Sequence, residues 1–324
     1  MENKPKNYRT DEHLSVGTRN YLDVLNAGGS PVESLSAADA RKVLVDVQAS
    51  VEVDLSGIDE RECEIAADGH TLTLHLVRPH DSRGRLPYFV FIHGGGWVLG
   101  DYPTHRRLVR DLVVESGFAA VFVDYTPSPE AKYPQAVDEI YAAMKWVAEN
   151  ATELDLDSRR MAVVGNSVGG NMALAAALLA KKRHAPAIRA LVLLWPVTSA
   201  SSDWESYALY GEERFLTTPL MQWMFDQYTT DAEARGEILL SPVNASREEL
   251  CGLPPTLIAV AENDILRDEG EAKGRRLDEA GVETTTVRFN GVIHDWGMLN
   301  GFARLAPTRD LILFVAAVLR HRLR

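Results

Sequence analysis

The pattern of hydrophobic and polar positions along this chain changes near Pro87. Downstream of that point, short unbroken apolar runs alternate with longer stretches in which apolar residues recur at helical spacing. The apolar runs are Tyr88–Ile92, Ala119–Val123, Met161–Val164, Ala190–Leu194 and Thr256–Ala261, with a more polar one at Thr284–Phe289. The helical stretches lie at about 104–116, 135–149, 169–182, 267–280 and 306–322. Continuous apolar strands separated by helices predict an α/β protein whose mostly parallel sheet is covered on both faces.

The region upstream of Pro87 predicts a β-hairpin. Two runs of alternating polarity, Glu62–Ala66 and Thr71–Val77, flank the turn residues Asp68 and Gly69. A short turn between two alternating runs is typical of antiparallel strands. A hairpin that feeds a parallel sheet predicts a mixed sheet.

The N-terminal part of the chain predicts one helix. Ser36 can cap its start, and Asp39 stands three residues further on. Apolar residues then recur at helical spacing at Ala40, Val43, Leu44 and Val47. Residues 1–30 are polar and include Gly28-Gly29, so we expect them to be partly ordered at best on their own.

Residues 199–250 interrupt the alternation of strands and helices. They lie between two strand signals and are far longer than an ordinary connection. This segment is rich in aromatic residues: Trp204, Tyr207, Tyr210, Phe215, Trp223, Phe225 and Tyr228. An aromatic insertion of this length is typical of a cap or binding element. The alternative is a helical excursion packed on the core.

Composition and charge narrow the range of partners. The 324 residues are 46% hydrophobic, which suffices for a large core, and the formal net charge is −12. That balance disfavours nucleic acid, because phosphate binding needs clustered Lys and Arg, and it gives no sign of stable membrane association. Only two cysteines occur, Cys63 and Cys251, which fits a reducing compartment. With a polar N-terminus and no long apolar segment, we expect a cytoplasmic protein, with a homodimer left open.

A glycine-rich turn surrounds Ser167. The apolar run Met161–Val164 leads into Gly165-Asn166-Ser167-Val168-Gly169, and a helix of small residues follows. This strand–turn–helix context is typical of a nucleophile elbow, whose sharp turn exposes the serine Oγ and requires small residues two before and two after it. The N-terminus of the following helix favours developing negative charge. We predict Ser167 as a nucleophile, the alternative being a structural glycine-rich turn.

Three consecutive glycines follow the strand that ends near Ile92, in His93-Gly94-Gly95-Gly96. Such a run costs backbone entropy, and it makes sense where N–H groups must approach a ligand. It matches the pattern that supplies oxyanion donors in esterases. We assign the donors to the amides of Gly95, Gly96 and Val168, with Gly94 as a further candidate. A phosphate-binding loop would need a following Lys-Ser/Thr, which is absent. We interpret His93 as structural.

An activated serine needs a base, which in α/β-hydrolases follows it in the chain. Three histidines follow Ser167: His184, His294 and His321. His184 ends a basic run and is expected to be solvated, and His321 lies near the end of a basic helix. His294 comes just after a predicted strand, where a base is expected, so we favour it.

The base needs a carboxylate that fixes its tautomer. Asp264 follows the predicted strand that ends at about Ala261 and lies between the serine and the histidine in the chain, as the fold requires. Glu262 and Asp268 are rivals, although Asp268 is expected to start the next helix. Asp295 adjoins His294 in sequence and is badly placed to meet its Nδ1.

Together these motifs resemble the hormone-sensitive-lipase family of α/β-hydrolases, which includes bacterial esterases and plant carboxylesterases. The resemblance runs from about Pro87 to the C-terminus. It rests on H-G-G-G-W-V-L-G-D (93–101), V-D-Y-T-P-S-P-E (123–130), G-N-S-V-G-G-N (165–171), S-P-V (241–243), D-I-L-R-D-E-G (264–270) and I-H-D-W (293–296).

The resemblance implies an α/β-hydrolase fold with a helical cap and a triad of Ser167, Asp264 and His294. It implies an N-terminal cap segment at residues 1–55 and a catalytic domain at 56–324, with a cap insertion at about 199–250. The implied activity is a serine carboxylesterase acting on small esters through an acyl-enzyme, with no metal or organic cofactor. An amidase or lactonase could use the same triad, and a non-catalytic small-molecule receptor on this fold is a further alternative.

The chain departs from the family pattern beside the nucleophile. The family usually has Asp or Thr before the serine and Ala after it, whereas this chain has Asn166 and Val168. The Val168 amide can still serve as an oxyanion donor. Its larger side chain predicts a narrow acyl site and hence short acyl chains, from acetyl to about hexanoyl. The motif also has Thr126-Pro127-Ser128 where Arg-Leu-Ala is common.

Overall fold

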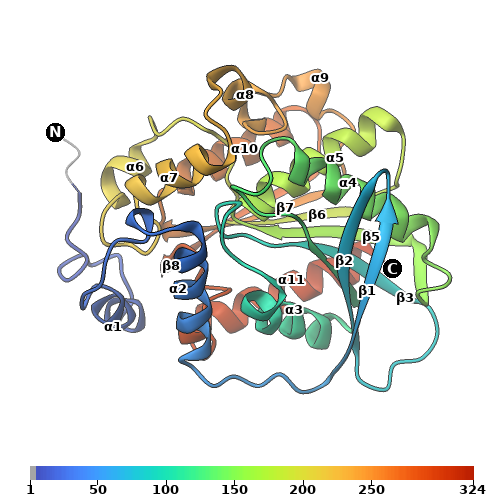
Figure 1. The fold of residues 1–324 in the computed structure, drawn as a ribbon, viewed down its shortest axis with the longest axis horizontal. Helices are drawn as coiled ribbons and strands as arrows, with labels where there is room; N and C mark the ends of the chain where they lie inside the picture. Colours follow the sequence, from blue (N-terminus) through green and yellow to red (C-terminus); the bar gives the residue numbers. More distant parts are fainter. Residues whose placement is uncertain (1–4) are drawn as a thin grey trace.

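The fold is organised around one mixed β-sheet (Figure 1). The computed structural model describes residues 5–324. The strands in that range are β1 (Ile58–Ala67), β2 (His70–Pro79), β3 (Leu86–Ile92), β4 (Ala119–Asp124), β5 (Leu156–Asn166), β6 (Ala190–Leu194), β7 (Thr256–Asn263) and β8 (Thr284–Ile293). They pair in the order β1-β2-β4-β3-β5-β6-β7-β8. The β1–β2 and β2–β4 pairs are antiparallel, and every pair from β4–β3 to β7–β8 is parallel, as the sequence predicts.

Helices cover both faces of this sheet. The helices that follow its strands are α3 (Tyr102–Ser116), α4 (Gln135–Glu149), α5 (Val168–Arg183), α10 (Arg267–Glu279) and α11 (Ala306–Arg322). Figure 1 shows α3 and α11 on one face and α4, α5 and α10 on the other. Central strands are therefore buried on both sides, which explains why β3 is apolar along its length rather than alternating. The edge strand β1 is largely exposed and reads as an alternating, charged segment.

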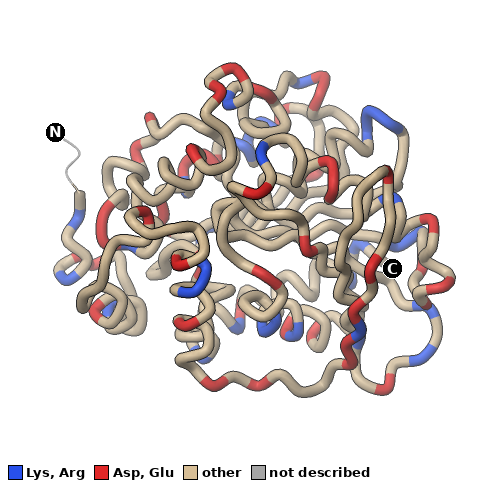
Figure 2. The backbone as a smooth tube through the Cα atoms, in the orientation of Figure 1, with Lys and Arg blue, Asp and Glu red and all other residues tan. Residues whose placement is uncertain are grey.

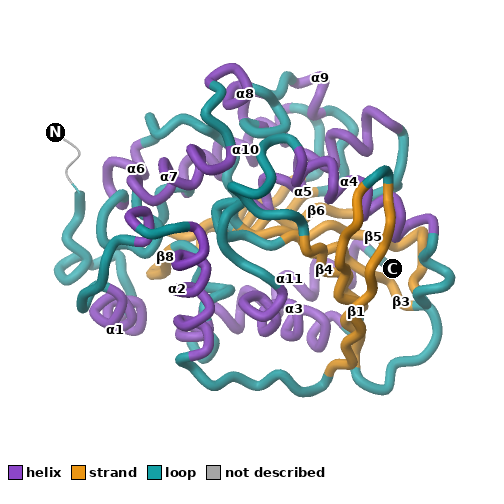
Figure 3. The backbone as a smooth tube through the Cα atoms, in the orientation of Figure 1, coloured by secondary structure: helices purple, strands orange, loops and turns teal. Residues whose placement is uncertain are grey.

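The remaining helices come from three other parts of the chain. From the N-terminal part come α1 (Val16–Leu25), η1 (Val32–Ser34) and α2 (Ala37–Ala49). Within 199–250 lie α6 (Glu205–Tyr210), α7 (Thr218–Tyr228), α8 (Ala232–Gly236), η2 (Pro242–Asn244) and α9 (Arg247–Leu250), and η3 (Asn300–Phe302) follows β8. Long loops join these short helices (Figure 3). The two groups meet, because the Lys6 amide donates to the carbonyl of Leu209 at 3.1 Å and α7 packs against η1.

The N-terminal segment is ordered by contacts with the rest of the chain. Residues 1–4 lie outside the described range. Ser15 caps α1, and its amide donates to the carbonyl of Gly291 at 3.0 Å. The Thr18 hydroxyl donates to the same carbonyl at 2.7 Å. Asp11 forms a buried ion pair with Arg214 at 2.9 Å. Order in this polar segment thus comes from tertiary structure, which local pattern does not reveal.

Charged residues lie mainly on the outer helices, the loops and the edge strand β1 (Figure 2). No helix among residues 5–324 is long and apolar enough to cross a bilayer. Within the same range, no group of three or more His, Cys, Asp or Glu side chains is arranged to hold a metal ion.

Candidate active site

Ser167 sits in a strained turn between β5 and α5. Its φ of 55° and ψ of −122° fall in a region that residues other than glycine rarely adopt. The surrounding backbone leaves no room for side chains on either flank. A Cβ added to Gly165 would lie 2.2 Å from the carbonyl oxygen of Gly169, and one on Gly169 would lie 2.0 Å from that of Ile92. Both clashes are with backbone atoms, so the two glycines are needed for the turn that presents the serine.

The structure brings Ser167, His294 and Asp264 into one hydrogen-bonded row. His294 follows β8 directly, and its Nε2 lies 3.0 Å from Ser167 Oγ. Asp264 follows β7 directly, and its Oδ2 lies 2.7 Å from His294 Nδ1. All three side chains are buried, at 4%, 2% and 2% exposure. The arrangement matches that expected for a nucleophile, a base and the carboxylate that orients the base.

The electrostatic environment favours a charged form of His294. Burial lowers its pKa, but the charges of Asp264 and Asp295 and the hydrogen bond to Asp264 outweigh burial, so the pKa is raised. With a proton on Nδ1 directed at Asp264, the Nε2 lone pair faces the serine hydroxyl. The ring is therefore placed to accept the serine proton and to be stabilised once it has done so.

The glycine loop after β3 carries unused N–H groups. Gly95 and Gly96 have positive φ values of 105° and 62°. Their amides have no hydrogen-bond acceptor among residues 5–324. The Val168 amide begins α5 and has no intrahelical acceptor either. These three groups are the donors that the sequence predicts for an oxyanion.

Gly94 differs from that prediction. Its amide already donates to Oδ1 of Asn166 at 3.0 Å, so it is not a free oxyanion donor. The reason is the residue before the nucleophile, whose side chain turns toward the loop. A Cβ added to Gly94 would meet Asn166 Nδ2 at 2.6 Å, which shows how closely the loop and the elbow pack.

The other histidines considered from sequence lie away from the serine or are already engaged. His93 is buried, its Nδ1 lies 2.8 Å from the carbonyl oxygen of Gly94, and its ring stacks on Tyr125 at 4.2 Å. Burial lowers the pKa of His93, which fits a neutral structural residue. His184 and His321 are exposed.

The rival carboxylates have other partners. Glu262 pairs with His13 at 3.0 Å and accepts from the Gly291 amide at 2.9 Å. Asp268 lies in the first turn of α10, as predicted, and pairs with Arg267 at 2.7 Å. Neither carboxylate has a hydrogen bond to His294 among the described residues.

A buried carboxylate beside the triad is the main feature missed from sequence. Asp295 Oδ1 accepts from Trp195 Nε1 at 2.6 Å and from Asn166 Nδ2 at 3.2 Å. Its Oδ2 lies 3.8 Å from His294 Nε2. As expected, Asp295 does not meet Nδ1; it lies near Nε2, the other nitrogen of the ring. The only sequence signal for this contact is its position next to His294.

The aromatic insertion covers the glycine loop. Trp97, next to the glycines, stacks on Tyr228 of α7 with ring centroids 4.4 Å apart. Phe225 of the same helix lies 5.1 Å from Trp97. Met224 packs directly on Gly96, where an added Cβ would lie 2.0 Å from its sulfur. The surface facing the unused amides is thus apolar on the α7 side.

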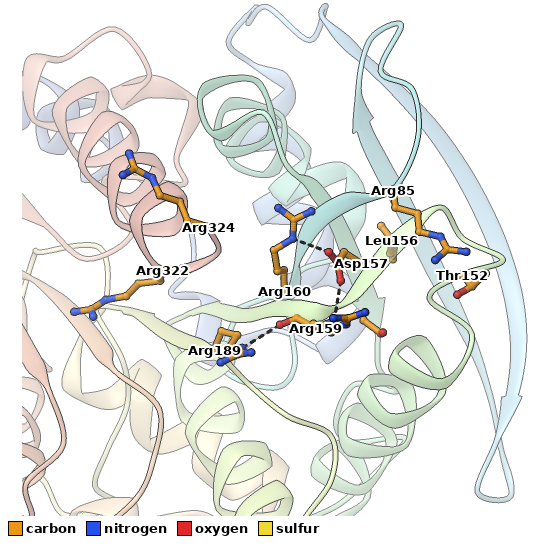
Figure 4. Close-up of a pocket in the computed structure, with 10 residues that line it drawn as sticks. Arg85, Thr152, Leu156, Asp157, Arg159, Arg160, Arg189, Arg322 and Arg324 are labelled. Atoms are coloured by element: carbon orange, nitrogen blue, oxygen red, sulfur yellow. Dashed lines mark hydrogen bonds and ion pairs between the residues drawn. The ribbon is translucent and has the colours of Figure 1, made fainter.

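A hollow lined by charged side chains lies at the end of the sheet opposite the triad (Figure 4). It has a volume of about 530 Å³ and lies where β3, β5 and β6 begin. Six arginines line it: Arg85, Arg159, Arg160, Arg189, Arg322 and Arg324. Arg160 pairs with Asp157 at 2.7 Å, and Arg322 pairs with Glu283. The hollow contains none of the triad residues, so it is not the candidate active site.

Comparison with known proteins places this chain among ester hydrolases. A family model described as alpha/beta hydrolase fold matches residues 89–298. The chain is 32% identical over 314 residues to an ethyl acetate hydrolase of Pseudomonas putida, covering 93% of this chain and 97% of the relative. It is 34% identical over 255 residues to carboxylesterase NlhH of Mycobacterium tuberculosis, covering 77% of each.

A solved structure resembles nearly the whole chain. The crystal structure of a thermostable esterase from Pseudomonas putida ECU1011 superposes with a TM-score of 0.96 at 51% sequence identity. The match covers 97% of this chain and 99% of that one. The likeness therefore includes the N-terminal segment and the 199–250 insertion as well as the sheet.

Proposed function

Since this chain belongs to the hormone-sensitive-lipase-like family of α/β-hydrolases and is a carboxylic ester hydrolase, we propose that Ser167, His294 and Asp264 form its catalytic triad. The observation that carries the proposal is the buried row of contacts at 3.0 Å and 2.7 Å that joins the three side chains. It lies beside three N–H groups with no acceptor among the described residues. Nucleophile, base, orienting acid and oxyanion donors are the four parts that acyl transfer needs.

The first half of the reaction forms an acyl-enzyme. Ser167 Oγ attacks the ester carbonyl carbon while its proton passes to Nε2 of His294. The carbonyl π electrons move onto oxygen, and the amides of Gly95, Gly96 and Val168 stabilise that negative charge. Asp264 stabilises the imidazolium. When the tetrahedral intermediate collapses, the C–O bond to the alcohol breaks and His294 returns the proton to the leaving oxygen.

The second half repeats these steps with water. His294 removes a proton from a water molecule whose oxygen attacks the acyl carbon. The same amides hold the second oxyanion, and collapse releases the carboxylic acid while the proton returns to Ser167 Oγ. Every proton and electron pair is accounted for by the triad, so we expect no metal or organic cofactor.

We propose that residues 1–55 and part of 199–250 form a cap over this site. The described contacts that support it are the buried Asp11–Arg214 ion pair between the two segments and the packing of α7 on the glycine loop.

Val168 is fully buried beside the serine, and Met224 occupies the space over Gly96. Both features support a preference for small-molecule esters with short acyl chains, from acetyl to about hexanoyl.

We further propose a cytoplasmic location, which the two free cysteines support.

The decisive experiment combines one variant with a substrate series. Ser167→Ala should lose turnover of p-nitrophenyl esters while keeping the melting temperature of the parent protein, since the change removes only the nucleophile. Ser158→Ala, an exposed serine on β5, serves as the matched control and should retain full activity. Full activity in Ser167→Ala would exclude the proposed triad.

The substrate series tests the acyl-chain preference. We expect turnover to peak between acetyl and hexanoyl p-nitrophenyl esters and to fall with longer chains. Matched p-nitroanilides and lactones separate an esterase from an amidase or lactonase with the same triad. A preference for emulsified long-chain triglyceride would contradict the proposed narrow acyl site.

A further inference from the structure

The side chain of Asn166 has one hydrogen-bonding orientation that suits its surroundings. Its Oδ1 accepts from the Gly94 amide at 3.0 Å, and its Nδ2 donates to Asp295 Oδ1 at 3.2 Å. Nδ2 also lies 3.4 Å from Nε2 of His105. Exchanging the amide oxygen and nitrogen would set two donors against each other at Gly94 and two acceptors against each other at Asp295. The contacts therefore fix which end of the amide faces the glycine loop.

The acceptor that orients Asn166 is itself held in place. Trp195 Nε1 donates to the same Oδ1 of Asp295 at 2.6 Å. Asp295, Asn166 and Trp195 are 4%, 0% and 0% exposed, so water does not compete for these bonds. Asp295 has a φ of 59°, a backbone conformation that Asp and Asn tolerate better than other non-glycine residues. A continuous chain of contacts thus runs from Trp195 through Asp295 and Asn166 to Gly94.

We propose that Asn166 and Asp295 are a pair of positioning residues that hold the glycine loop beside Ser167, with the Asp295 carboxylate also stabilising the protonated form of His294. This inference rests on the proposed triad and adds two residues to it. Gly94 is the first residue of the loop, so securing its amide leaves those of Gly95 and Gly96 directed at the substrate oxygen. Preorganised donors of this kind lower the barrier because they need no rearrangement as charge develops.

The second part of the proposal follows from the placement of two carboxylates around one ring. Asp264 lies 2.7 Å from Nδ1 of His294, and Asp295 lies 3.8 Å from Nε2. The imidazolium formed during catalysis therefore has a negative charge on either side. Burial raises the pKa of Asp295, and its interactions with His294, Trp195 and Asn166 act against that shift.

Few other titratable groups approach this cluster. The ring of His105, on α3, contacts Asn166, and burial holds its pKa well below the ordinary value, so it stays neutral. Tyr21, on α1, has a pKa raised to about 12 by burial and by the charge of Asp295, so it also stays neutral. A change in the acid limb of the pH profile on altering Asp295 therefore reports on the His294–Asp295 pair itself and not on these two neighbours.

Three variants separate the two roles. Asp295→Asn keeps an oxygen where Trp195 and Asn166 donate, and it removes the charge, with an amide nitrogen in place of Oδ2. Asn166→Asp keeps the acceptor for Gly94 but sets a second carboxylate against Asp295, at the 3.2 Å now spanned by a hydrogen bond. The double variant Asn166→Asp/Asp295→Asn leaves one carboxylate in the pair. Asp310→Asn, on the exposed surface of α11, is the matched control for loss of one negative charge.

We expect Asp295→Asn to shift the acid limb of kcat/KM to lower pH, because the imidazolium loses one of its two neighbouring charges, while Asp310→Asn leaves it in place. Asn166→Asp should lower kcat by at least about tenfold with little change in KM, since misplacing an oxyanion loop weakens transition-state binding. The double variant should regain part of that kcat, because the repulsion between two charges is gone. The amide oxygen at position 295 that accepts from Trp195 still faces the carboxylate at position 166, so recovery is incomplete.

The outcomes are distinguishable from those that test the triad. If Ser167→Ala keeps turnover, the proposed function fails and this inference fails with it. If Ser167→Ala is inactive, an unshifted acid limb in Asp295→Asn, or a double variant no faster than Asn166→Asp, overturns the positioning pair alone. Should Asn166→Asp not fold, the pH profile of Asp295→Asn decides, because that variant keeps every hydrogen bond of the parent.

Discussion

The sulfur of Met224 lies over the backbone of Gly96, so close that a Cβ on that glycine would approach it to 2.0 Å. Met224 is thus the residue of α7 that packs on Gly96, one of the proposed oxyanion donors. Met224→Ala should open space there and raise the kcat/KM for octanoyl over butyryl p-nitrophenyl esters by about tenfold, the lower range of what a pocket gains per methylene.

The control for that prediction is Gln222→Ala, an exposed position on the same helix, which should leave the ratio unchanged. A Met224→Ala variant that hydrolyses the two esters in the parent ratio would show that acyl length is limited elsewhere, for example by Val168.

The acid limb of the wild-type pH profile should reflect His294. Burial disfavours its charged form, but Asp264 and Asp295 outweigh burial and raise its pKa above the ordinary value. His294 must be neutral to accept the serine proton, so activity is present above its pKa and lost as the pH falls through it. We therefore expect the midpoint of the acid limb in kcat/KM to lie above about 6.5. A midpoint clearly below that value would argue against two charged neighbours.

The buried pair between Asp11 and Arg214 should be important for stability. Their side chains are 2% and 1% exposed, and Nε and one terminal nitrogen of Arg214 have no hydrogen-bond partner among the described residues. Asp11→Ala leaves a buried guanidinium uncompensated, which costs roughly 3–5 kcal/mol. Chemical denaturation should report that loss, and limited proteolysis should cut the N-terminal segment faster. Asp46→Ala, which removes the exposed partner of Lys42 on α2, should cost under about 1 kcal/mol.

Lys273 makes stability depend on pH in an unusual direction. It is fully buried, and burial lowers its pKa to about 7, while its Nζ donates to the carbonyl of Pro242 at 2.8 Å. Below pH 7 the folded protein carries a buried charge, and that cost disappears as the pH rises toward the ordinary lysine value. Lys273→Met should therefore raise the melting temperature more at pH 6 than at pH 9.5. The same change at exposed Lys182 should give no such difference.

Regular elements with a strong pattern could be predicted from the sequence. The helix at 135–149 and the strand Ala190–Leu194 match α4 and β6 in full, because their apolar positions are continuous or periodic to the ends. The strand predicted at Met161–Val164 extends in both directions to Leu156–Asn166, and residues 157–160 within it are polar, half-buried or exposed, and leave no apolar signal. The helix α1 has exposed Val16 and Val24, which obscure its buried face.

The candidate site likewise has one part that the sequence indicates and another that it does not. Ser167, Asp264 and His294 can be chosen from sequence because each follows a strand and their order in the chain is fixed by the fold. The contacts of Asp295 with Trp195 and Asn166 join residues 100 and 129 positions apart. Nothing in the local pattern near either partner indicates such a contact, since it depends on how β5, β6 and the loop after β8 come together. The hydrogen bond from the Gly94 amide to Asn166, which removes Gly94 from the oxyanion donors, is not indicated by the local pattern for the same reason.

The hydrogen bond from Thr18 to Gly291, which spans 273 positions, has a consequence for biosynthesis. At a synthesis rate of about 5–20 residues per second, Thr18 emerges from the ribosome roughly 15 to 55 s before its partner. During that interval the N-terminal helix has no docking surface, and the loop carrying His294 does not yet exist. Assembly of the site is therefore one of the last events in folding of the nascent chain, and partial translation products should have no hydrolytic activity.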